Sequence, residues 1–306
     1  MIFARRQAES LIARGVEVEC FYLCSRTSPG ALVAELLRFR RVSARLRPAV
    51  VHAHFGTVTA LFAALACGRS PLMITFRGTD LNHAPSGGAR AAAGHVFSQL
   101  AALRACSIVC VSRQLRSRLW WRKRDVVVIP SGVDSAQFHP LDRSEARKRL
   151  GWSQEQRVVL FNSGHDARNK RLDLAEAALG LARLTLPDLR LEILRGNTNP
   201  ESIPLLMNAS DCLLVASESE GSPTVVQEAL ACGLPIASVA VGDIEDRLRQ
   251  VSHTHIVPRD AARLAQAIVE LTEVPLRTDG RAKMGEISLE FIAGKLMSLY
   301  ETVARS

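Results

Sequence analysis

Short runs of apolar, mostly β-branched residues alternate along the chain with segments in which apolar residues recur every three or four positions. The runs cover residues 16–23, 49–55, 72–76, 108–111, 158–161, 189–194, 212–216 and 235–241. Buried parallel strands produce such runs, and the segments between them have the spacing of helices. The alternation therefore predicts an α/β protein with two sets of parallel strands joined by crossover helices.

The two sets are separated by the stretch Val126-Val-Val-Ile-Pro-Ser-Gly-Val-Asp-Ser-Ala-Gln-Phe-His-Pro140. It predicts the last strand of the first set, followed by a loop that contains proline and glycine, and a charged helix begins at Asp142. A chain of 306 residues is also longer than one hydrophobic core usually serves. We predict an N-terminal domain over residues 1–137 and a C-terminal domain over residues 138–306, with the boundary near Phe138.

The first residues have a helical pattern, because Ala4, Ala8, Leu11 and Ile12 are spaced as one apolar face before Gly15. An open α/β domain normally begins with a central strand and a turn that lead into such a helix. The usual first strand and glycine-rich turn are absent ahead of this helix. We therefore expect either a start internal to a longer protein or a first domain built without that strand.

Composition narrows the class of protein. Apolar residues make up 47% and charged residues 23%, as in folded globular proteins. No apolar run approaches the roughly 20 residues of a membrane helix, and the first 15 residues are too charged for a signal peptide, so we expect a cytoplasmic protein. The seven cysteines show no paired C-x-x-C spacing, and we expect buried free thiols without a metal site.

The net charge of +9 suits an anionic partner such as a nucleotide diphosphate, nucleic acid or an anionic membrane surface. The chain contains no recognisable nucleic-acid-binding module, and we do not expect nucleic acid as a partner.

The stretch Ser217-Glu-Ser-Glu-Gly-Ser-Pro-Thr-Val-Val-Gln-Glu-Ala-Leu-Ala-Cys-Gly-Leu-Pro-Ile236 follows a predicted strand and has the signals of a tight turn and a short helix. Ser222 is suited to cap the helix, Pro223 to its first position and Gly233 to its left-handed exit. A helix start at the carboxyl end of a parallel sheet offers unpaired N–H groups to an anion. We therefore expect a phosphate at the turn formed by Gly221, Ser222, Pro223 and Thr224, and we count Val225 with them among the donor-binding residues.

Two carboxylates bracket this turn. Glu220 precedes it, and Glu228 lies roughly 9 Å from Ser222 along the helix axis at about 1.5 Å per residue. Carboxylates repel phosphate but accept hydrogen bonds from hydroxyl groups. A nucleotide sugar, which has hydroxyls on both sides of a diphosphate, suits this arrangement. The alternative is that both glutamates are solvated residues flanking a capped helix.

The spacing from Glu220 to Glu228, with E-G-S-P and E-A-L-A-C-G-L-P around it, resembles the E-x7-E motif of the family 4 retaining glycosyltransferases. In that family the first glutamate contacts the donor sugar and the second contacts the ribose hydroxyls. The linker V-I-P-S-G-V-D-x-x-x-F-x-P and the C-terminal stretch 291–300 also resemble family segments. The resemblance implies a GT-B fold, in which two Rossmann-like domains face a central cleft and the C-terminal helix returns to the first domain.

A second match is Phe161-Asn-Ser-Gly-His-Asp-Ala-Arg-Asn-Lys-Arg-Leu-Asp173, where the family usually has G-R and then K-G. Lys170 falls on the lysine, whose ammonium would neutralise the diphosphate as the leaving group gains charge. His165 stands where the family has the arginine, and Arg168 can supply the missing guanidinium. We expect His165, Arg168 and Gly164 to line the donor site. The alternative is that Arg168 and Lys170 are surface residues at a helix start that bind no ligand, although positive charge is unfavourable there without an anion.

The first half of the chain carries H-A-H-F-G at residues 52–56 and T-F-R-G-T-D at residues 75–80, which resemble the family's H-a-H-f-G and T-f-H-G-x-D segments. Strand ends of this kind are where α/β domains bind ligands. We take His54, Arg77 and Asp80 as acceptor-side candidates, and Arg77, at the family's histidine position, also as a possible donor-phosphate contact. The alternative for the histidines is a structural role.

Two basic stretches remain, at residues 36–47 and 113–124, and the second contains Trp120 and Trp121. Arginine with tryptophan on a helix suits the interface of a membrane that carries a lipid-linked acceptor. We expect peripheral contact at the inner membrane surface through these helices. The alternative is a solvated helix face whose aromatic residues pack inward.

The combined prediction is a hexosyltransferase of polysaccharide or glycoconjugate biosynthesis. It would move a sugar from a nucleoside diphosphate sugar to a hydroxyl acceptor, which can be a glycan, a lipid-linked molecule or a small molecule. Retention at the anomeric carbon is implied by the resemblance. The chain has no D-x-D segment to hold a divalent ion, so we expect no metal and no cofactor besides the donor. The alternatives are a donor-binding relative that does not transfer the sugar and a nucleotide-sugar epimerase on the same fold.

Overall fold

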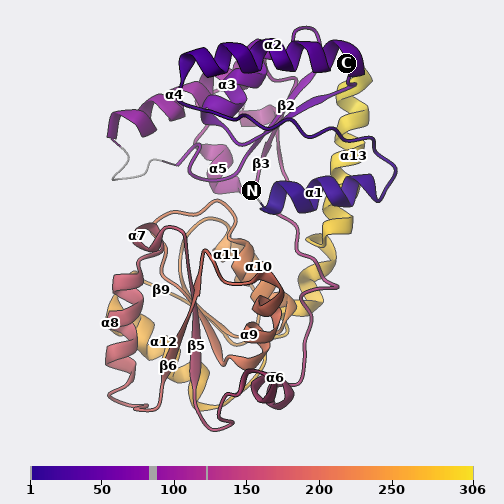
Figure 1. Ribbon diagram of the computed structural model, residues 1–306. Coiled ribbons are helices and arrows are strands. Elements are labelled where there is room, and N and C mark those ends of the chain that lie inside the picture. Colours follow the sequence, from indigo (N-terminus) through magenta and orange to yellow (C-terminus); the bar gives the residue numbers. More distant parts are fainter. Residues whose placement is uncertain (1, 83–87, 122, 306) are drawn as a thin grey trace. The chain divides into compact units, whose positions relative to one another are not determined.

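The computed structural model describes residues 2–82, 88–121 and 123–305, which form two compact units (Figure 1). Unit 1 comprises residues 1–131 and 289–306, and unit 2 comprises residues 132–288. The division falls earlier than the boundary predicted near Phe138, because Phe138 is fully buried in the core of unit 2. The last helix, α13 (Leu289–Arg305), belongs to unit 1, so the C-terminal helix returns to the N-terminal unit as predicted.

Unit 2 contains a five-stranded parallel sheet in the order β6-β5-β7-β8-β9. Its strands are β5 (Val158–Gly164), β6 (Arg190–Arg195), β7 (Cys212–Val215), β8 (Ile236–Val239) and β9 (Thr254–Val257). The next two strands after β5 lie on opposite sides of it, so the winding of the sheet reverses between β5 and β7. Ligands of open α/β sheets bind at such a switch point, outside the carboxyl ends of the strands.

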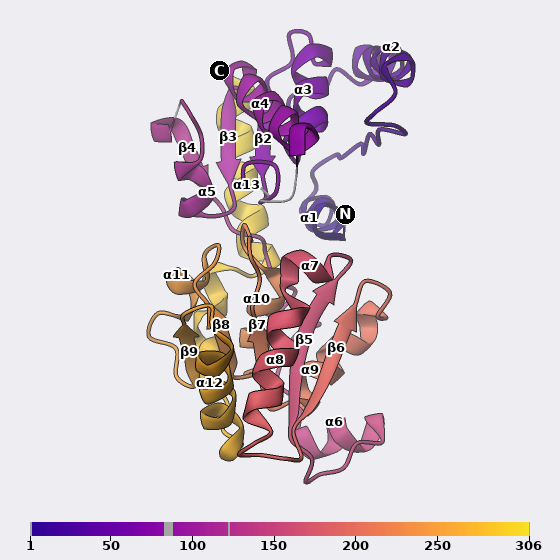
Figure 2. The same cartoon turned by 90° about the vertical axis from the view of Figure 1, so that its left-hand side faces the viewer.

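Helices cover both faces of this sheet (Figures 1 and 2). One face carries α8 (Leu172–Ala182) and α12 (Ala261–Glu273), and the other carries α9 (Ile203–Ala209) and α10 (Thr224–Ala231). The remaining helices are α6 (Arg143–Leu150), α7 (Ala167–Lys170), α11 (Ile244–Leu248) and the 3-10 turns η2 (Pro200–Ser202) and η3 (Gly280–Glu286). Ala175, Leu179 and Ala182 form the buried face of α8.

The described strands of unit 1 form a four-stranded parallel sheet in chain order, β1-β2-β3-β4. They are β1 (Val51–His54), β2 (Leu72–Phe76), β3 (Ser107–Cys110) and β4 (Val126–Val128). Alternate residues of β2 enter different core clusters: Leu72 and Ile74 lie in one, and Met73 lies in the other. Both faces of the sheet are therefore covered, which explains the continuous apolar runs.

One face of this sheet carries α3 (Thr57–Ala66) and α4 (Gly88–Arg104), and α2 (Pro29–Leu46) lies beside α3 (Figures 1 and 2). The other face is covered by α13 and α1 (Ile2–Ile12), where Leu11, Ile292 and Leu296 share a cluster with Met73 of β2. The short elements are α5 (Arg113–Ser117) and η1 (Lys123–Asp125). No helix in the described chain has both the length and the apolar character needed to span a bilayer.

The strand predicted over residues 16–23 is not formed, and this segment is irregular. Val16 and Val18 pack against the cluster of α1 and α13, while Glu17 and Glu19 are exposed. The alternation of apolar and polar residues thus specifies one buried face, but it does not specify a neighbouring strand. All seven cysteines are free, but the prediction that they are buried is wrong for those in or near such irregular segments, Cys20, Cys24 and Cys106.

Candidate active site

The loop between β7 and α10, residues 216–223, leaves the carboxyl end of the middle strand of the unit 2 sheet. It is hydrogen-bonded to the loop that follows β5. Glu218 N donates to Asn169 O at 2.7 Å, and Asn169 Nδ2 donates to Ser219 O at 3.0 Å. The two loops on either side of the switch point are therefore fixed to each other.

Lys170 and Glu220 meet across these two loops. The Lys170 ammonium donates a hydrogen bond to Glu220 Oε1 within an ion pair, and the two side chains keep 21% and 14% of their surface exposed. Lys170 is the last residue of α7, whose start is capped by Asp166, which accepts from Asn169 N at 2.9 Å. The structure thus brings together the lysine expected to neutralise the diphosphate and the glutamate that the family resemblance places at the donor sugar.

The start of α10 differs from the prediction. The helix begins at Thr224 with Pro223 at the N-cap position, so the prediction that Ser222 caps it is wrong. Ser222 Oγ instead donates to Asp243 Oδ2 at 2.9 Å and accepts from Gln227 Nε2 at 2.9 Å. A carboxylate is a stronger acceptor than a neutral group, and it draws the hydroxyl away from the helix. No side chain caps the described start of α10, where an anion would find N–H groups.

One face of α10 is open. Between residues 221 and 231 only Thr224 and Glu228 are partly exposed, and all the others are buried. Residues four apart lie on the same face of a helix, so the open face runs from the turn to the second glutamate. Gly221, Ser222, Pro223 and Val225 offer a ligand little side-chain surface, and their contribution would come from the backbone.

Two residues that sequence reasoning missed come from the loop between β8 and α11. Gly242 has φ +64°, and a Cβ at this position would lie 2.9 Å from Gly221 O and 3.2 Å from Glu220 Cβ. Asp243 is 5% exposed; burial raises its pKa, and Arg247 Nε at 2.9 Å opposes this. The V-G-D sequence after the predicted strand at 235–241 could have indicated a turn at the same edge of the sheet.

The other predicted donor residues lie at the end of β5 and in α7, which follows it. Gly164 has φ +51°, and His165 and Arg168 are exposed. The His165 ring lies so close to Gly196 that a Cβ there would come within 2.0 Å of Nδ1. Arg171 follows Lys170 and so stands where the family usually has glycine. Its side chain pairs with Asp173 at 2.9 Å.

In unit 1, the carboxyl ends of β1 and β2 bring His54 and Arg77 together. Arg77 Nη2 lies 3.2 Å from His54 Nδ1 and donates to Gln7 Oε1 at 2.7 Å. Burial lowers the pKa of Arg77 to about 10. Burial and the neighbouring guanidinium lower the pKa of His54 to about 3, so the imidazole is neutral. Because arginine only donates, His54 Nδ1 is the acceptor and its proton is on Nε2.

Asp80, the third acceptor-side candidate, is fully buried. Its carboxylate accepts backbone hydrogen bonds from Gly56 at 2.8 Å, Gly78 at 2.7 Å and Arg77 at 3.0 Å. Burial raises its pKa, and these three N–H groups act in the opposite direction. Asp80 holds the loops after β1 and β2 in shape and lies beneath the surface that a ligand would contact.

His52 fits the structural alternative. Its ring nitrogens lie 2.7 Å from Tyr300 Oη and 2.7 Å from Thr75 Oγ1, and burial lowers its pKa well below the ordinary value. Both polar atoms of the ring are therefore satisfied within unit 1.

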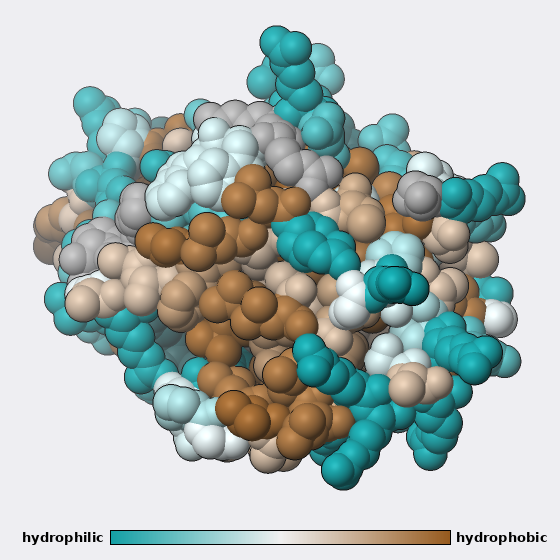
Figure 3. All heavy atoms as spheres, turned by 90° about the horizontal axis from the view of Figure 1, so that it is seen from above, coloured by the Kyte–Doolittle hydropathy of each residue, from teal (hydrophilic) through white to brown (hydrophobic). Residues whose placement is uncertain are grey.

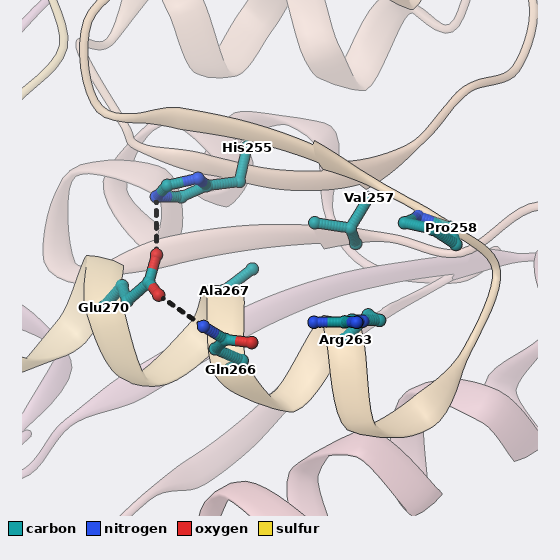
Figure 4. Close-up of a pocket in the computed structure, with 7 residues that line it drawn as sticks. All are labelled: His255, Val257, Pro258, Arg263, Gln266, Ala267 and Glu270. Carbon is teal, nitrogen blue, oxygen red and sulfur yellow. Dashed lines mark hydrogen bonds and ion pairs between the residues drawn. The ribbon is translucent and has the colours of Figure 1, made fainter.

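A hollow of about 290 Å³ lies elsewhere on unit 2, between β9 and α12 (Figure 4). Its polar residues pair with one another: His255 Nε2 lies 3.3 Å from Glu270 Oε2, and Gln266 Nε2 donates to Glu270 Oε1 at 3.0 Å. None of the predicted site residues lines it. The hollow therefore lies apart from the candidate site at the switch point.

Comparison with known families gives two matches. A model described as Glycosyltransferase Family 4 matches residues 1–137, and a model described as Glycosyl transferases group 1 matches residues 154–273. Together they include every predicted site residue.

Curated relatives of this chain are also named as glycosyltransferases. A Bacillus subtilis protein named as a teichuronic acid biosynthesis glycosyltransferase is 29% identical over 245 residues, covering 73% of this chain and 61% of the relative. D-inositol 3-phosphate glycosyltransferase of Geodermatophilus obscurus is 28% identical over 238 residues, covering 63% of this chain and 51% of the relative. The chain thus spans about half to three fifths of the length of these relatives.

Solved structures share the fold. Sucrose-phosphate synthase of Thermosynechococcus elongatus has a TM-score of 0.84 at 19% identity, covering 100% of this chain and 94% of that chain. HepE of Anabaena in complex with UDP has a TM-score of 0.72 at 19% identity, covering 96% of this chain and 89% of that chain. At these identities the likeness concerns the fold alone, and it confirms the predicted α/β class of GT-B type with two parallel sheets.

Proposed function

Because the chain belongs to the family 4 glycosyltransferases, we propose that it transfers a hexose from a nucleoside diphosphate sugar to a hydroxyl acceptor, with retention at the anomeric carbon. The observation that carries this proposal is the meeting of Lys170 and Glu220 at the switch point between β5 and β7. The start of α10 lies in the same loop, so a cation, a carboxylate and backbone N–H groups converge at one edge of the sheet.

The donor diphosphate would bind at the backbone of residues 221–224 and at Lys170. The open face of α10 then gives Glu228 access to the ribose hydroxyls, and Glu220 is left to accept from hydroxyls of the donor sugar. Arg168 and His165, both exposed at the end of β5, would border the phosphates. In this arrangement the ligand bridges the segments after β5 and β7, which hydrogen bonds already join.

During transfer, the bond between the anomeric carbon and the diphosphate oxygen breaks, and the electron pair stays on the oxygen. The Lys170 ammonium and the N–H groups of α10 would stabilise the growing negative charge, because they are fixed before the reaction. The acceptor oxygen bonds to the anomeric carbon as its hydroxyl proton passes to the departing diphosphate oxygen. We propose that these groups suffice without a metal ion or a cofactor.

Binding would also rearrange the ion pair. A diphosphate carries more charge than one carboxylate, so it would draw the Lys170 ammonium toward itself. Glu220 would then have acceptor capacity for sugar hydroxyls. The pair therefore holds both side chains at the site while each remains able to change partner.

On the acceptor side we propose His54 and Arg77, while Asp80 supports their loops. A hydroxyl acceptor that carries an anionic group fits a cluster with a buried guanidinium. Two relatives support this class by name, D-inositol 3-phosphate glycosyltransferase and phosphatidyl-myo-inositol mannosyltransferase, the second from Propionibacterium freudenreichii. The acceptor can thus be a small molecule or a lipid, and we propose action in the cytoplasm at the inner membrane surface.

A second candidate function is donor binding without transfer. It is favoured by the sheet of unit 1, because the described strands β1 to β4 follow chain order and have no switch point among them. An open sheet of this kind lacks the crevice in which a ligand would usually bind.

Calorimetric titration with UDP, GDP and ADP tests the proposal. We expect one nucleotide to bind, and we expect Glu228→Ala to weaken it while Glu176→Ala, an exposed glutamate of α8, leaves it unchanged. Incubation of the matching labelled nucleotide sugar with inositol phosphates and with lipid extracts then separates the two candidates. A glycosylated product supports transfer, whereas binding without product supports the second candidate, and absence of all nucleotide binding contradicts both.

A further inference from the structure

The two units carry net charges of opposite sign. Unit 1 contains 21 lysines and arginines against 8 aspartates and glutamates, a formal net charge of +13. Unit 2 contains 18 against 22, a formal net charge of −4. The basic character of the chain is therefore a property of unit 1, although the donor diphosphate is proposed to bind on unit 2. Donor binding therefore does not explain the positive net charge of unit 1.

Unit 1 also exposes a band of large apolar side chains on the helices that cover one face of its sheet. We call this set the apolar band; it consists of Val33 and Leu37 on α2, Leu65 on α3, and Val96, Leu100 and Leu103 on α4. Their exposure ranges from 39% for Val96 to 66% for Leu65. The spacing of the α4 members places all three on one side of the helix. Figure 3 shows hydrophobic residues gathered across this side of the molecule.

The charges next to the apolar band are almost all positive. Exposed arginines of α2 and of the ends of α2, α3 and α4 are Arg40, Arg41, Arg45, Arg47, Arg69 and Arg104. The sequences of α2, α3 and α4 contain one acidic residue, Glu35, which is buried and paired with Arg38. A partner at this face would meet apolar side chains and arginines, with no exposed carboxylate on the three helices.

The aromatic part of the second basic stretch is engaged elsewhere. Trp120 and Trp121 lie beyond the end of α5 and not on a helix, so that part of the prediction is wrong. Trp121 Nε1 donates to Gln99 O at 3.0 Å, and Trp120 N donates to Gln99 Oε1 at 3.0 Å. The Trp121 indole is thereby held against α4, as the alternative of inward-packing aromatic residues has it, whereas Trp120 keeps 54% of its surface exposed.

We propose that the face formed by α2, α3 and α4 docks onto an anionic lipid bilayer. The apolar band would enter the boundary between headgroups and acyl chains, and the arginines would lie among anionic headgroups. A bilayer offers apolar and anionic groups together over a wide area, whereas nucleic acid would leave the apolar band uncovered. Docking rests on the proposed action at the inner membrane surface and names the face that would bind; because it does not depend on sugar transfer, it is tested without donor or acceptor.

The test is flotation of the full chain with vesicles of phosphatidylcholine and with vesicles that also contain phosphatidylglycerol. We expect binding to the second type only, with binding falling as salt is raised. One variant, Leu100→Gln with Leu103→Gln, removes apolar surface from α4. A second, Arg41→Gln with Arg45→Gln, removes two charges and should weaken binding roughly 25-fold, at about fivefold for each arginine near the surface.

Two variants on unit 2 serve as matched controls, Leu184→Gln and Arg263→Gln, because both residues are exposed and lie outside the apolar band. Thermal unfolding and nucleotide binding check that all variants are folded. Equal binding to both vesicle types, or unchanged binding by both α2 and α4 variants, overturns the proposal. It is also overturned if the chain is a dimer that the leucine variant alone converts to a monomer, since a second copy would then cover the apolar band.

Discussion

The ammonium of Lys170 forms an ion pair with the carboxylate of Glu220, although the two residues are 50 positions apart in the chain. They come from the loops after β5 and β7, the strands between which the sheet reverses its winding. The pair therefore marks the place where the topology alone would put a ligand. Agreement between topology and side-chain chemistry is the strongest argument for the donor site.

Removal of the cation should weaken nucleotide binding. For Lys170→Ala we expect a loss of about 1.5–3 kcal/mol in the binding free energy of the nucleoside diphosphate, the usual size for a hydrogen bond to a charged group. Isothermal titration calorimetry measures the loss. Lys148→Ala, an exposed lysine of α6, is the control. Equal affinity of the two variants would remove Lys170 from the site.

Removal of the carboxylate should have the opposite effect on the diphosphate. Glu220→Gln keeps the shape of the side chain but ends the ion pair and the repulsion of phosphate, so we expect nucleoside diphosphate affinity at least equal to that of the unchanged protein. We expect sugar transfer to fall at least tenfold, because the contact with the donor sugar is weakened. Calorimetry measures the diphosphate affinity, and a product assay measures sugar transfer. Loss of diphosphate affinity would show that Glu220 positions the loop instead.

A methyl group at Gly242 should disturb the loop 216–223, at which the donor is proposed to bind. Gly242 and Gly151 have φ values of +64° and +67°, but only at Gly242 would a Cβ meet backbone, at 2.9 Å from Gly221 O. Both alanine variants lose about 1 kcal/mol of stability from the left-handed conformation. Only Gly242→Ala should also weaken nucleotide binding, by tenfold or more. Similar nucleotide affinity in the two variants would mean that the loop tolerates the shift.

Acid should destabilise unit 1 through His54. Its pKa is about 3 in the folded chain and near 6.5 when unfolded, so the unfolded state binds the proton first as the pH falls. Stability is complete above about pH 6.5 and declines toward pH 3, with up to about 2 kcal/mol lost by pH 5. His54→Asn retains an acceptor for Arg77 and should reduce this pH dependence in urea unfolding. His253→Asn, an exposed histidine, should leave it unchanged.

Chelation should leave the reaction unaffected. The diphosphate charge is proposed to be met by Lys170 and the start of α10, so we expect full transfer activity in EDTA. Activity that is lost in EDTA and restored by magnesium would contradict this prediction. Calcium in place of magnesium controls for a nonspecific effect of divalent ions.

The sequence determined most of the strands and the residues of the loop 216–223 that carries the donor site. The strand at residues 72–76 is apolar at every position but one, and it is buried on both faces of its sheet, as such runs predict. Gly233 has φ +70° just after α10, as its place before Leu234 and Pro235 indicated. These features are local, because the residues that encode them lie within one strand or one helix end.

Tertiary structure alone decided which groups pair. Ser222 bonds to Asp243 instead of capping α10, and the segment 16–23 packs without joining the sheet, because each outcome depends on groups distant in the sequence. β9 was not predicted, since none of its four residues at the edge of the sheet is buried. The sequence thus fixes which residues are apolar, charged or flexible in the backbone. Only the packing of loops from separate strands decides which hydrogen bonds form, because a buried hydroxyl such as that of Ser222 is stabilised by the strongest acceptor that packing brings within reach.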